Sequence, residues 1–156
     1  MHLFDYLDSG NGYKVRLLLA QLGMTYEWTN VDIDKGETRT PEFLKRNPNG
    51  RIPTLQLDDG TYLPESNAIL WYLAEGTAYL PDDRLRRARV LQWLCFERAL
   101  TPAVAGARFQ IMTERTDEET PLLLVKARTH LATLDRRLDG RDWVATDTPT
   151  IADIAL

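Results

Sequence analysis

Apolar residues in the first part of the chain follow two different spacings. Residues 1–7 (MHLFDYL) and 25–31 (TYEWTNV) are short apolar-rich runs typical of strands. Between them, four apolar residues recur at the i, i+3, i+4 and i+7 spacing of one helix face, which Gly23 ends: Val15, Leu18, Leu19 and Leu22. The pattern predicts a β-α-β unit, whose two strands should be parallel.

The pattern changes after this unit. A polar stretch follows, with one short helical piece at 41–46 (PEFLKR). The runs at 52–57 (IPTLQL) and 61–65 (TYLPE) flank the turn signal DDG and predict an antiparallel hairpin. A helix from Ser66 to about Ala74 then completes the order β-α-β, helical crossover, β-β-α.

The second part of the chain carries helical patterns. One helix is expected from Arg84 to about Met112, and a second begins near Pro121 and stops at Gly140. Its apolar seam consists of Leu124, Ala127, Leu131, Leu134 and Leu138. Residues 76–84 (GTAYLPDDR) have the Gly and Pro of a linker. We predict an α/β domain at 1–78, a linker at 79–86 and an all-α domain at 87–156.

Composition narrows the class of protein. The 156 residues include 23 acidic and 19 basic ones, for a net charge of -4, and no Lys/Arg stripe interleaves with aromatics, so nucleic acid is not an expected partner. Asp5 and Asp8 lie where a signal peptide would be basic and apolar, and no run is long enough for a membrane span. We expect a cytoplasmic protein that does not associate with a membrane.

The single cysteine, Cys95, excludes an internal disulfide and a Cys-x-x-Cys metal or redox pair. It lies within the long helical pattern beside Leu94 and Phe96, so it is expected to be a small buried hydrophobe. No metal is predicted.

The helix at 66–74 begins with Glu65 and Ser66. Ser66 fits the N-cap position, and capping alone would explain a serine there. The first turn of a helix also binds anions, because its amides and dipole converge there. An acidic residue beside a bound carboxylate makes sense if it faces an ammonium, so the pair could hold an α-amino acid end.

Pro53 opens a strand, which an edge strand tolerates. A cis Ile52–Pro53 bond would leave the backbone N–H and C=O of Ile52 available to a peptide ligand. A trans bond is the alternative, and the residues alone do not separate the two.

These features together resemble a cytosolic glutathione S-transferase of bacterial type, over residues 1–156. NPNGRIPTL and LPESNAILWYLAE are the most specific segments, followed by DSGNGYKVRLLLAQLG. TPTIADIAL is similar to the start of the family's sixth helix, where Thr150 and Asp153 would form a capping box. The resemblance implies a thioredoxin-like N-terminal domain followed by a helical domain that is truncated at its C-terminus, because seven residues are too few for the sixth helix.

The resemblance also implies a site for glutathione. Glu65 and Ser66 would hold the amino and carboxylate ends of its γ-glutamyl part. Ile52, before cis Pro53, would pair its backbone with the cysteinyl part. The side chain of Arg51 would lie near the ligand.

Two residues match thiolate donors of the family. Ser9 matches the serine of serine-type classes, and Asn11 matches an asparagine in classes with PNG at this place. Tyr6 falls one residue off the aligned tyrosine position, and a one-residue shift turns a strand side chain to the opposite face. We therefore expect Tyr6 to be structural.

Arg108, Phe109 and Met112 would line an electrophile pocket facing Ser9. The implied function is glutathione S-transferase activity on a small hydrophobic electrophile, in a homodimer. Two alternatives stay open: glutathione-dependent disulfide or peroxide reduction, and a non-catalytic binding module with the same fold.

Overall fold

The computed structural model describes residues 1–156, which form two compact units, Met1–Thr77 and Ala78–Leu156. The linker expected at 79–86 stays a prediction, and the first long helix of the second unit begins within that range at Arg84. No helix in either unit combines the length and apolar character that crossing a membrane requires.

The first unit has the thioredoxin-like order that the sequence predicted. It consists of β1 (His2–Asp5), α1 (Gly10–Gln21), β2 (Glu27–Asn30), a 3-10 turn η1 (Glu37–Arg39), α2 (Pro41–Arg46), β3 (Thr54–Gln56), β4 (Tyr62–Pro64) and α3 (Ser66–Ala74). The strands form one sheet in the order β2-β1-β3-β4. β1 and β2 are parallel and β3 and β4 are antiparallel, which confirms these two predicted pairings. β3 also pairs with β1, in antiparallel orientation.

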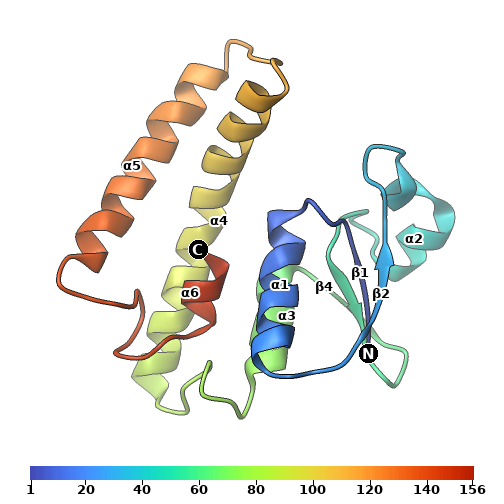
Figure 1. The fold of residues 1–156 in the computed structure, drawn as a ribbon, viewed down its shortest axis with the longest axis horizontal. Helices are drawn as coiled ribbons and strands as arrows, with labels where there is room; N and C mark the ends of the chain where they lie inside the picture. Colours follow the sequence, from blue (N-terminus) through green and yellow to red (C-terminus); the bar gives the residue numbers. More distant parts are fainter. The chain divides into compact units, whose positions relative to one another are not determined.

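The two faces of this sheet are covered by different helices (Figure 1). α1 and α3 lie side by side against one face, and α2 lies at the other. Because alternate strand residues point to opposite faces, Phe4 of β1 packs with Val31 and with Phe43 of α2, and its neighbours Leu3 and Asp5 point toward α1 and α3. The core on that face contains Leu3, Val15, Leu18, Leu19, Leu55, Ile69 and Leu70, all fully buried.

The second unit is helical, as predicted. α4 (Arg84–Met112) and α5 (Thr120–Leu138) run alongside each other, and the short α6 (Ile151–Ala155) packs on α4 (Figure 1). An aromatic contact joins the two long helices: the Phe96 ring of α4 lies 5.6 Å from the His130 ring of α5 between centroids. Within α4, the Phe96 ring also lies 5.1 Å from the Trp93 ring.

The expectation that seven residues cannot form a sixth helix is wrong. Thr150 and Asp153 form the predicted capping box, in which the Ala152 amide donates to Thr150 Oγ1 at 3.2 Å and the Thr150 amide donates to Asp153 Oδ2 at 2.8 Å. Asp153 Oδ1 also accepts from the Val144 amide at 2.8 Å. These bonds satisfy first-turn amides and buried Ile151 anchors the turn, so five residues suffice.

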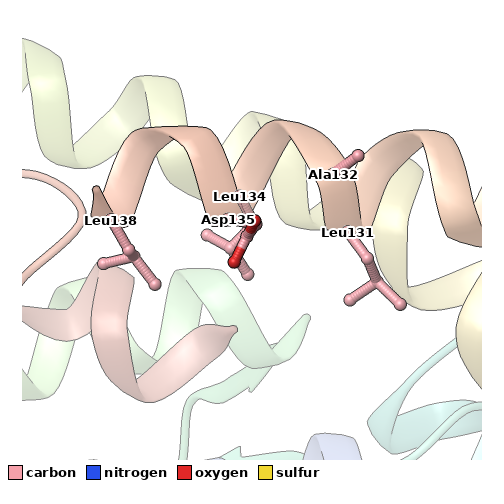
Figure 2. A pocket seen from close by; sticks show the side chains of 5 residues that line it. All are labelled: Leu131, Ala132, Leu134, Asp135 and Leu138. Atoms are coloured by element: carbon pink, nitrogen blue, oxygen red, sulfur yellow. The ribbon is translucent and has the colours of Figure 1, made fainter.

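The apolar seam of α5 is partly uncovered. Ala127 is buried, whereas Leu131 is 46% exposed. Figure 2 shows Leu131, Leu134 and Leu138 projecting from the same side of the helix, where they line an open hollow with Ala132 and Asp135.

Cys95 is exposed, so its expected burial is wrong. The buried positions of α4 in this region are Val90, Trp93, Leu94 and Glu97. On the helical wheel these four positions share one side, and Cys95 lies on the opposite side and faces outward.

Candidate functional site

Ser9 caps the start of α1. The Gly12 amide donates to Ser9 Oγ at 3.2 Å, and the Ser9 amide donates to the Tyr6 carbonyl at 2.9 Å. Ser9 is half-buried. A hydroxyl that accepts one bond still has its own hydrogen to donate. Capping and donation to a ligand are therefore compatible roles for this side chain.

The start of α3 is built differently. Its N-cap is Glu65, whose carbonyl accepts the first helical bond from the Ile69 amide at 2.9 Å and whose side chain makes no capping bond. Ser66 is the first helical residue, so its assignment as the N-cap is wrong. Glu65 has a φ of 72° and a ψ of 110°. A non-glycine residue is strained in such a backbone conformation, and strained residues concentrate at functional sites.

A hydrogen bond joins the two helix starts. The Ser66 hydroxyl donates a hydrogen bond to the side-chain oxygen Oδ1 of Asn11 at 3.3 Å. Beside it, Lys14 Nζ donates to Asn67 Oδ1 at 3.1 Å, and Lys14 is 4% exposed. The structure thus brings Asn11 and Ser66 together as part of one cluster.

The sequence reasoning missed Lys14 and Asn67. Lys14 follows Gly12 and Tyr13 on a helix whose buried face was read only from its apolar residues, so a buried lysine gave no signal. Asn67 directly follows the Glu65–Ser66 pair, and its position in the first turn of α3 was the available clue.

The loop before β3 keeps the backbone of Ile52 out of the strand pairing of the sheet. The Ile52–Pro53 peptide bond is cis, which agrees with the resemblance. The β3 pairing begins only at Thr54, so the N–H and C=O of Ile52 are outside the ladder. Ile52 itself is half-buried against the cluster around Phe4.

Asn47 organises this loop and was also missed. It is 1% exposed, and its Nδ2 donates to the Arg51 carbonyl at 2.7 Å and to Thr54 Oγ1 at 3.3 Å. Its Oδ1 accepts from the Asn49 amide at 3.0 Å. An asparagine before proline is a turn signal, which could have identified it. The Arg51 side chain is exposed, and its approach to a ligand stays a prediction.

The Tyr6 hydroxyl donates a hydrogen bond to Asp34 Oδ2 at 3.0 Å. This hydrogen bond, with the nearby negative charge, raises the pKa of the Tyr6 phenol above its ordinary value. A phenol with a raised pKa is a weaker acid. The structure therefore gives Tyr6 a role in tying β1 to the loop after β2.

The three residues expected to line an electrophile pocket lie near the end of α4 in the second unit. Arg108, Phe109 and Met112 are all exposed, Phe109 by 57% and Met112 by 68%. Their relation to Ser9 stays a prediction. Neither unit holds a group of three or more His, Cys, Asp or Glu side chains arranged for a metal ion.

Comparison with known proteins adds to this geometry. Residues 1–75 match the family model of the glutathione S-transferase N-terminal domain. A maleylacetoacetate isomerase of Pseudomonas aeruginosa is 45% identical over 94 residues, which cover 57% of this chain and only 44% of that protein. A maleylacetoacetate isomerase of Rhizobium meliloti is 36% identical over 99% of this chain and 77% of its own length.

A disulfide-bond oxidoreductase of Escherichia coli is 32% identical over 96% of this chain and 74% of its own length. Among solved structures, a glutathione S-transferase from Pseudomonas fluorescens superposes with a TM-score of 0.94, at 42% identity over 99% of this chain and 79% of the other. A glutathione transferase from Pseudomonas putida with glutathione disulfide bound has a TM-score of 0.87 at 32% identity, over 99% and 71% of the two chains. The chain belongs to the glutathione S-transferase family, a family of glutathione-dependent enzymes.

Proposed function

We propose that this chain binds glutathione at the start of α3 and stabilises its thiolate at the start of α1, for attack on a hydrophobic electrophile. The observation that carries the proposal is the Ser66–Asn11 hydrogen bond of 3.3 Å between the two helix starts. It joins the first turn of α3, which would bind the γ-glutamyl carboxylate, to the start of α1, which would supply the thiolate donors.

The start of α3 suits the γ-glutamyl end of glutathione. Its first-turn amides receive no cap from the Glu65 side chain, and amides at a helix N-terminus attract a carboxylate. The Ser66 hydroxyl and amide would add donors to that carboxylate. The Glu65 carboxylate, which is exposed, would pair with the ammonium group.

The middle of glutathione would extend along the loop before β3. The backbone N–H and C=O of Ile52 lie outside the sheet ladder and match the peptide groups of an extended cysteinyl part. The exposed Arg51 side chain would reach a carboxylate of the ligand.

The start of α1 would hold the sulfur. A free thiol of this type has a pKa of about 8.5 and is mostly protonated at neutral pH. Donors aimed at the thiolate, at a helix N-terminus, lower that pKa. The Ser9 hydroxyl has its hydrogen available, and Asn11 uses its oxygen on Ser66, which leaves its amide N–H groups as donors.

Glutathione binding would also change the Asn11 contact. When a carboxylate takes the Ser66 hydroxyl hydrogen, Asn11 loses the donor that now holds its oxygen. Its amide group is then released to reorient toward the sulfur. Binding at α3 and activation at α1 would be coupled through this one bond.

Other parts of the proposal concern the second substrate and the assembly. Arg108, Phe109 and Met112 supply an exposed apolar and cationic surface that suits a hydrophobic electrophile. We also propose a homodimer in the cytoplasm, which is the arrangement expected for this family.

Two related reactions have specific support. Relatives named maleylacetoacetate isomerase favour addition of the thiolate to an activated alkene, followed by rotation and elimination, without net consumption of glutathione. A relative named disulfide-bond oxidoreductase, and a neighbour holding glutathione disulfide, favour disulfide reduction. Since Cys95 lies on α4 and not at α1, reduction would use the glutathione thiol alone.

The reactions separate in a panel of assays on the purified chain with glutathione. Turnover of an activated aromatic chloride is expected, and its kcat/KM should fall about 100-fold or more in the Ser9→Ala, Asn11→Ala double variant. Turnover of a mixed disulfide alone would select the reductase, and conversion of a cis-unsaturated diketo acid alone would select the isomerase. A folded chain that binds no glutathione would contradict all three and favour a binding module.

A further inference from the structure

Asp5 is a buried carboxylate beneath the start of α1. It ends β1, it is 0% exposed, and strand alternation turns it toward α1 with Leu3. Neither of its carboxylate oxygens accepts a well-formed hydrogen bond. Buried carboxylates are normally paired and hydrogen-bonded. The burial of Asp5 without such hydrogen bonds therefore needs an explanation.

Arg16 of α1 is the charged residue that faces it. Arg16 Nη1 lies 3.1 Å from Asp5 Oδ2, at an angle that makes an ion pair without a hydrogen bond. Arg16 Nη2 donates to the Leu7 carbonyl at 2.7 Å. The guanidinium therefore bridges the end of β1 and the loop between β1 and α1.

That loop carries Ser9. The Ser9 amide donates to the Tyr6 carbonyl at 2.9 Å, and its hydroxyl accepts from the Gly12 amide at 3.2 Å. Gly12 also touches the carboxylate, because a Cβ there would lie 1.7 Å from Asp5 Oδ1. Asp5 thus contacts the Ser9 loop from two sides, through Arg16 and through Gly12.

The folded state disfavours the ionised form of Asp5. Burial raises the pKa of the Asp5 carboxyl above its ordinary value, and the Tyr6 amide and the Arg16 guanidinium only partly oppose this. A raised native pKa means that the folded state holds the proton more tightly than the unfolded chain does. The fold therefore loses stability as pH rises from the ordinary aspartate pKa through the raised one.

We infer that Asp5 and Arg16 are positioning residues, which hold the Leu7 carbonyl and thereby aim the Ser9 hydroxyl at the glutathione sulfur. The inference rests on the proposed function. A hydroxyl donor loses most of its effect on a thiolate when it is displaced by about 1 Å. The ionised pair would keep Ser9 in place at the expense of some stability.

The test uses Asp5→Asn, which keeps the shape and removes the charge, and Arg16→Gln, which removes the guanidinium from both Asp5 and the Leu7 carbonyl. The matched control is Asp32→Asn, since Asp32 also pairs with a cation, Lys35 at 2.8 Å, but in an exposed loop. The pKa of the bound glutathione thiol is measured from the ultraviolet absorbance of the thiolate. Glutathione affinity and the free energy of unfolding are measured in parallel.

Both variants should raise the thiol pKa by about half a unit to one unit and lower kcat/KM about three- to tenfold at fixed pH. Glutathione affinity should change less than about twofold, since the γ-glutamyl end binds at α3. Asp5→Asn should unfold no more easily than the wild type, and Asp32→Asn should leave the thiol pKa unchanged. An unchanged thiol pKa in both variants would overturn the inference, and so would failure of both to fold.

A second readout separates this inference from the proposed function. Amide hydrogen exchange at Ser9 and Gly12 needs no ligand, and it should be about tenfold faster in Asp5→Asn if the pair holds the loop. If the wild type binds no glutathione, the proposed function fails, and unchanged exchange at these two amides would overturn the loop-holding role as well.

Discussion

α1 and α3 lie side by side on one face of the same sheet, yet their N-termini are built in opposite ways. α1 is capped from within, because the Ser9 hydroxyl accepts from the Gly12 amide and Gly12 packs on the Asp5 carboxylate. α3 begins at a residue with a φ of 72° and has no side-chain cap. The start of α1 therefore has a stabilising side-chain cap. The start of α3 has no such cap and begins at a strained residue.

The difference indicates that the two helices have different roles in the proposed site. An open terminus with strain at its N-cap suits ligand binding, since the ligand can supply the missing cap. A capped terminus holds the Ser9 hydroxyl and the backbone around it in a fixed position, which suits stabilisation of a thiolate. The predictions below test this division, beginning with the largest effect.

Gly12→Ala should disrupt the start of α1. A Cβ at this position would lie 1.7 Å from Asp5 Oδ1 and 2.1 Å from Asp5 Cγ, which forces a buried group to move. We expect a loss of about 3 kcal/mol or more in the free energy of unfolding by denaturant titration. Gly10→Ala, where nothing lies within 4 Å of the new methyl group, is the control and should change stability little.

Ser9→Ala combined with Asn11→Ala should lower kcat/KM about 100-fold or more, or about 2.7 kcal/mol in transition-state free energy, because the thiolate loses both donors. Glutathione affinity by calorimetry should fall much less, since the γ-glutamyl end binds at α3. Equal losses in affinity and in kcat would contradict the division between the helices.

Glu65→Gly should relieve the strain at the start of α3. Glycine adopts positive φ without a Cβ penalty, so this variant should be about 1 kcal/mol more stable to unfolding than Glu65→Ala. Both variants remove the partner of the ammonium group and should bind glutathione about tenfold more weakly. A Glu65→Gly variant that is less stable than Glu65→Ala would show that the conformation is not strained.

Single serine variants should give the smallest effects. Ser9→Ala removes a helix cap and should cost about 1 kcal/mol of stability. Ser66→Ala removes only the 3.3 Å bond to Asn11 and should cost about 0.5 kcal/mol. Thermal unfolding of the two variants measures the difference, and a larger loss for Ser66→Ala would reverse the comparison.

Most of the fold could be predicted from periodicity. The Val15–Leu22 spacing and the turn at DDG gave α1 and the β3–β4 hairpin, because each depends on local patterning. The N-cap of α3 could not be predicted in this way. Ser66 has the better capping side chain, but the chain enters the helix through Glu65 in a rare backbone conformation that tertiary context imposes.

Burial was the least predictable property. Cys95 was expected inside because of its apolar neighbours, yet the helical wheel turns it outward. Lys14 and Asp5 are polar residues that the fold buries, and only the packing of α1 on the sheet explains their positions. Four residues of the proposed glutathione site, Ser9, Asn11, Glu65 and Ser66, could be predicted from the sequence. The residues that hold the neighbouring loops, Asn47, Arg16 and Asp5, became visible only in three dimensions.

The most direct test is calorimetric titration of glutathione into the wild-type chain and into the Glu65→Ala, Ser66→Ala double variant. Loss of the charged partner and the hydroxyl at the open start of α3 should weaken binding at least about 100-fold while the chain stays folded by circular dichroism. Equal binding by the two proteins would contradict the placement of the glutathione site at α3. A folded wild-type chain that does not bind glutathione would contradict the proposed function itself.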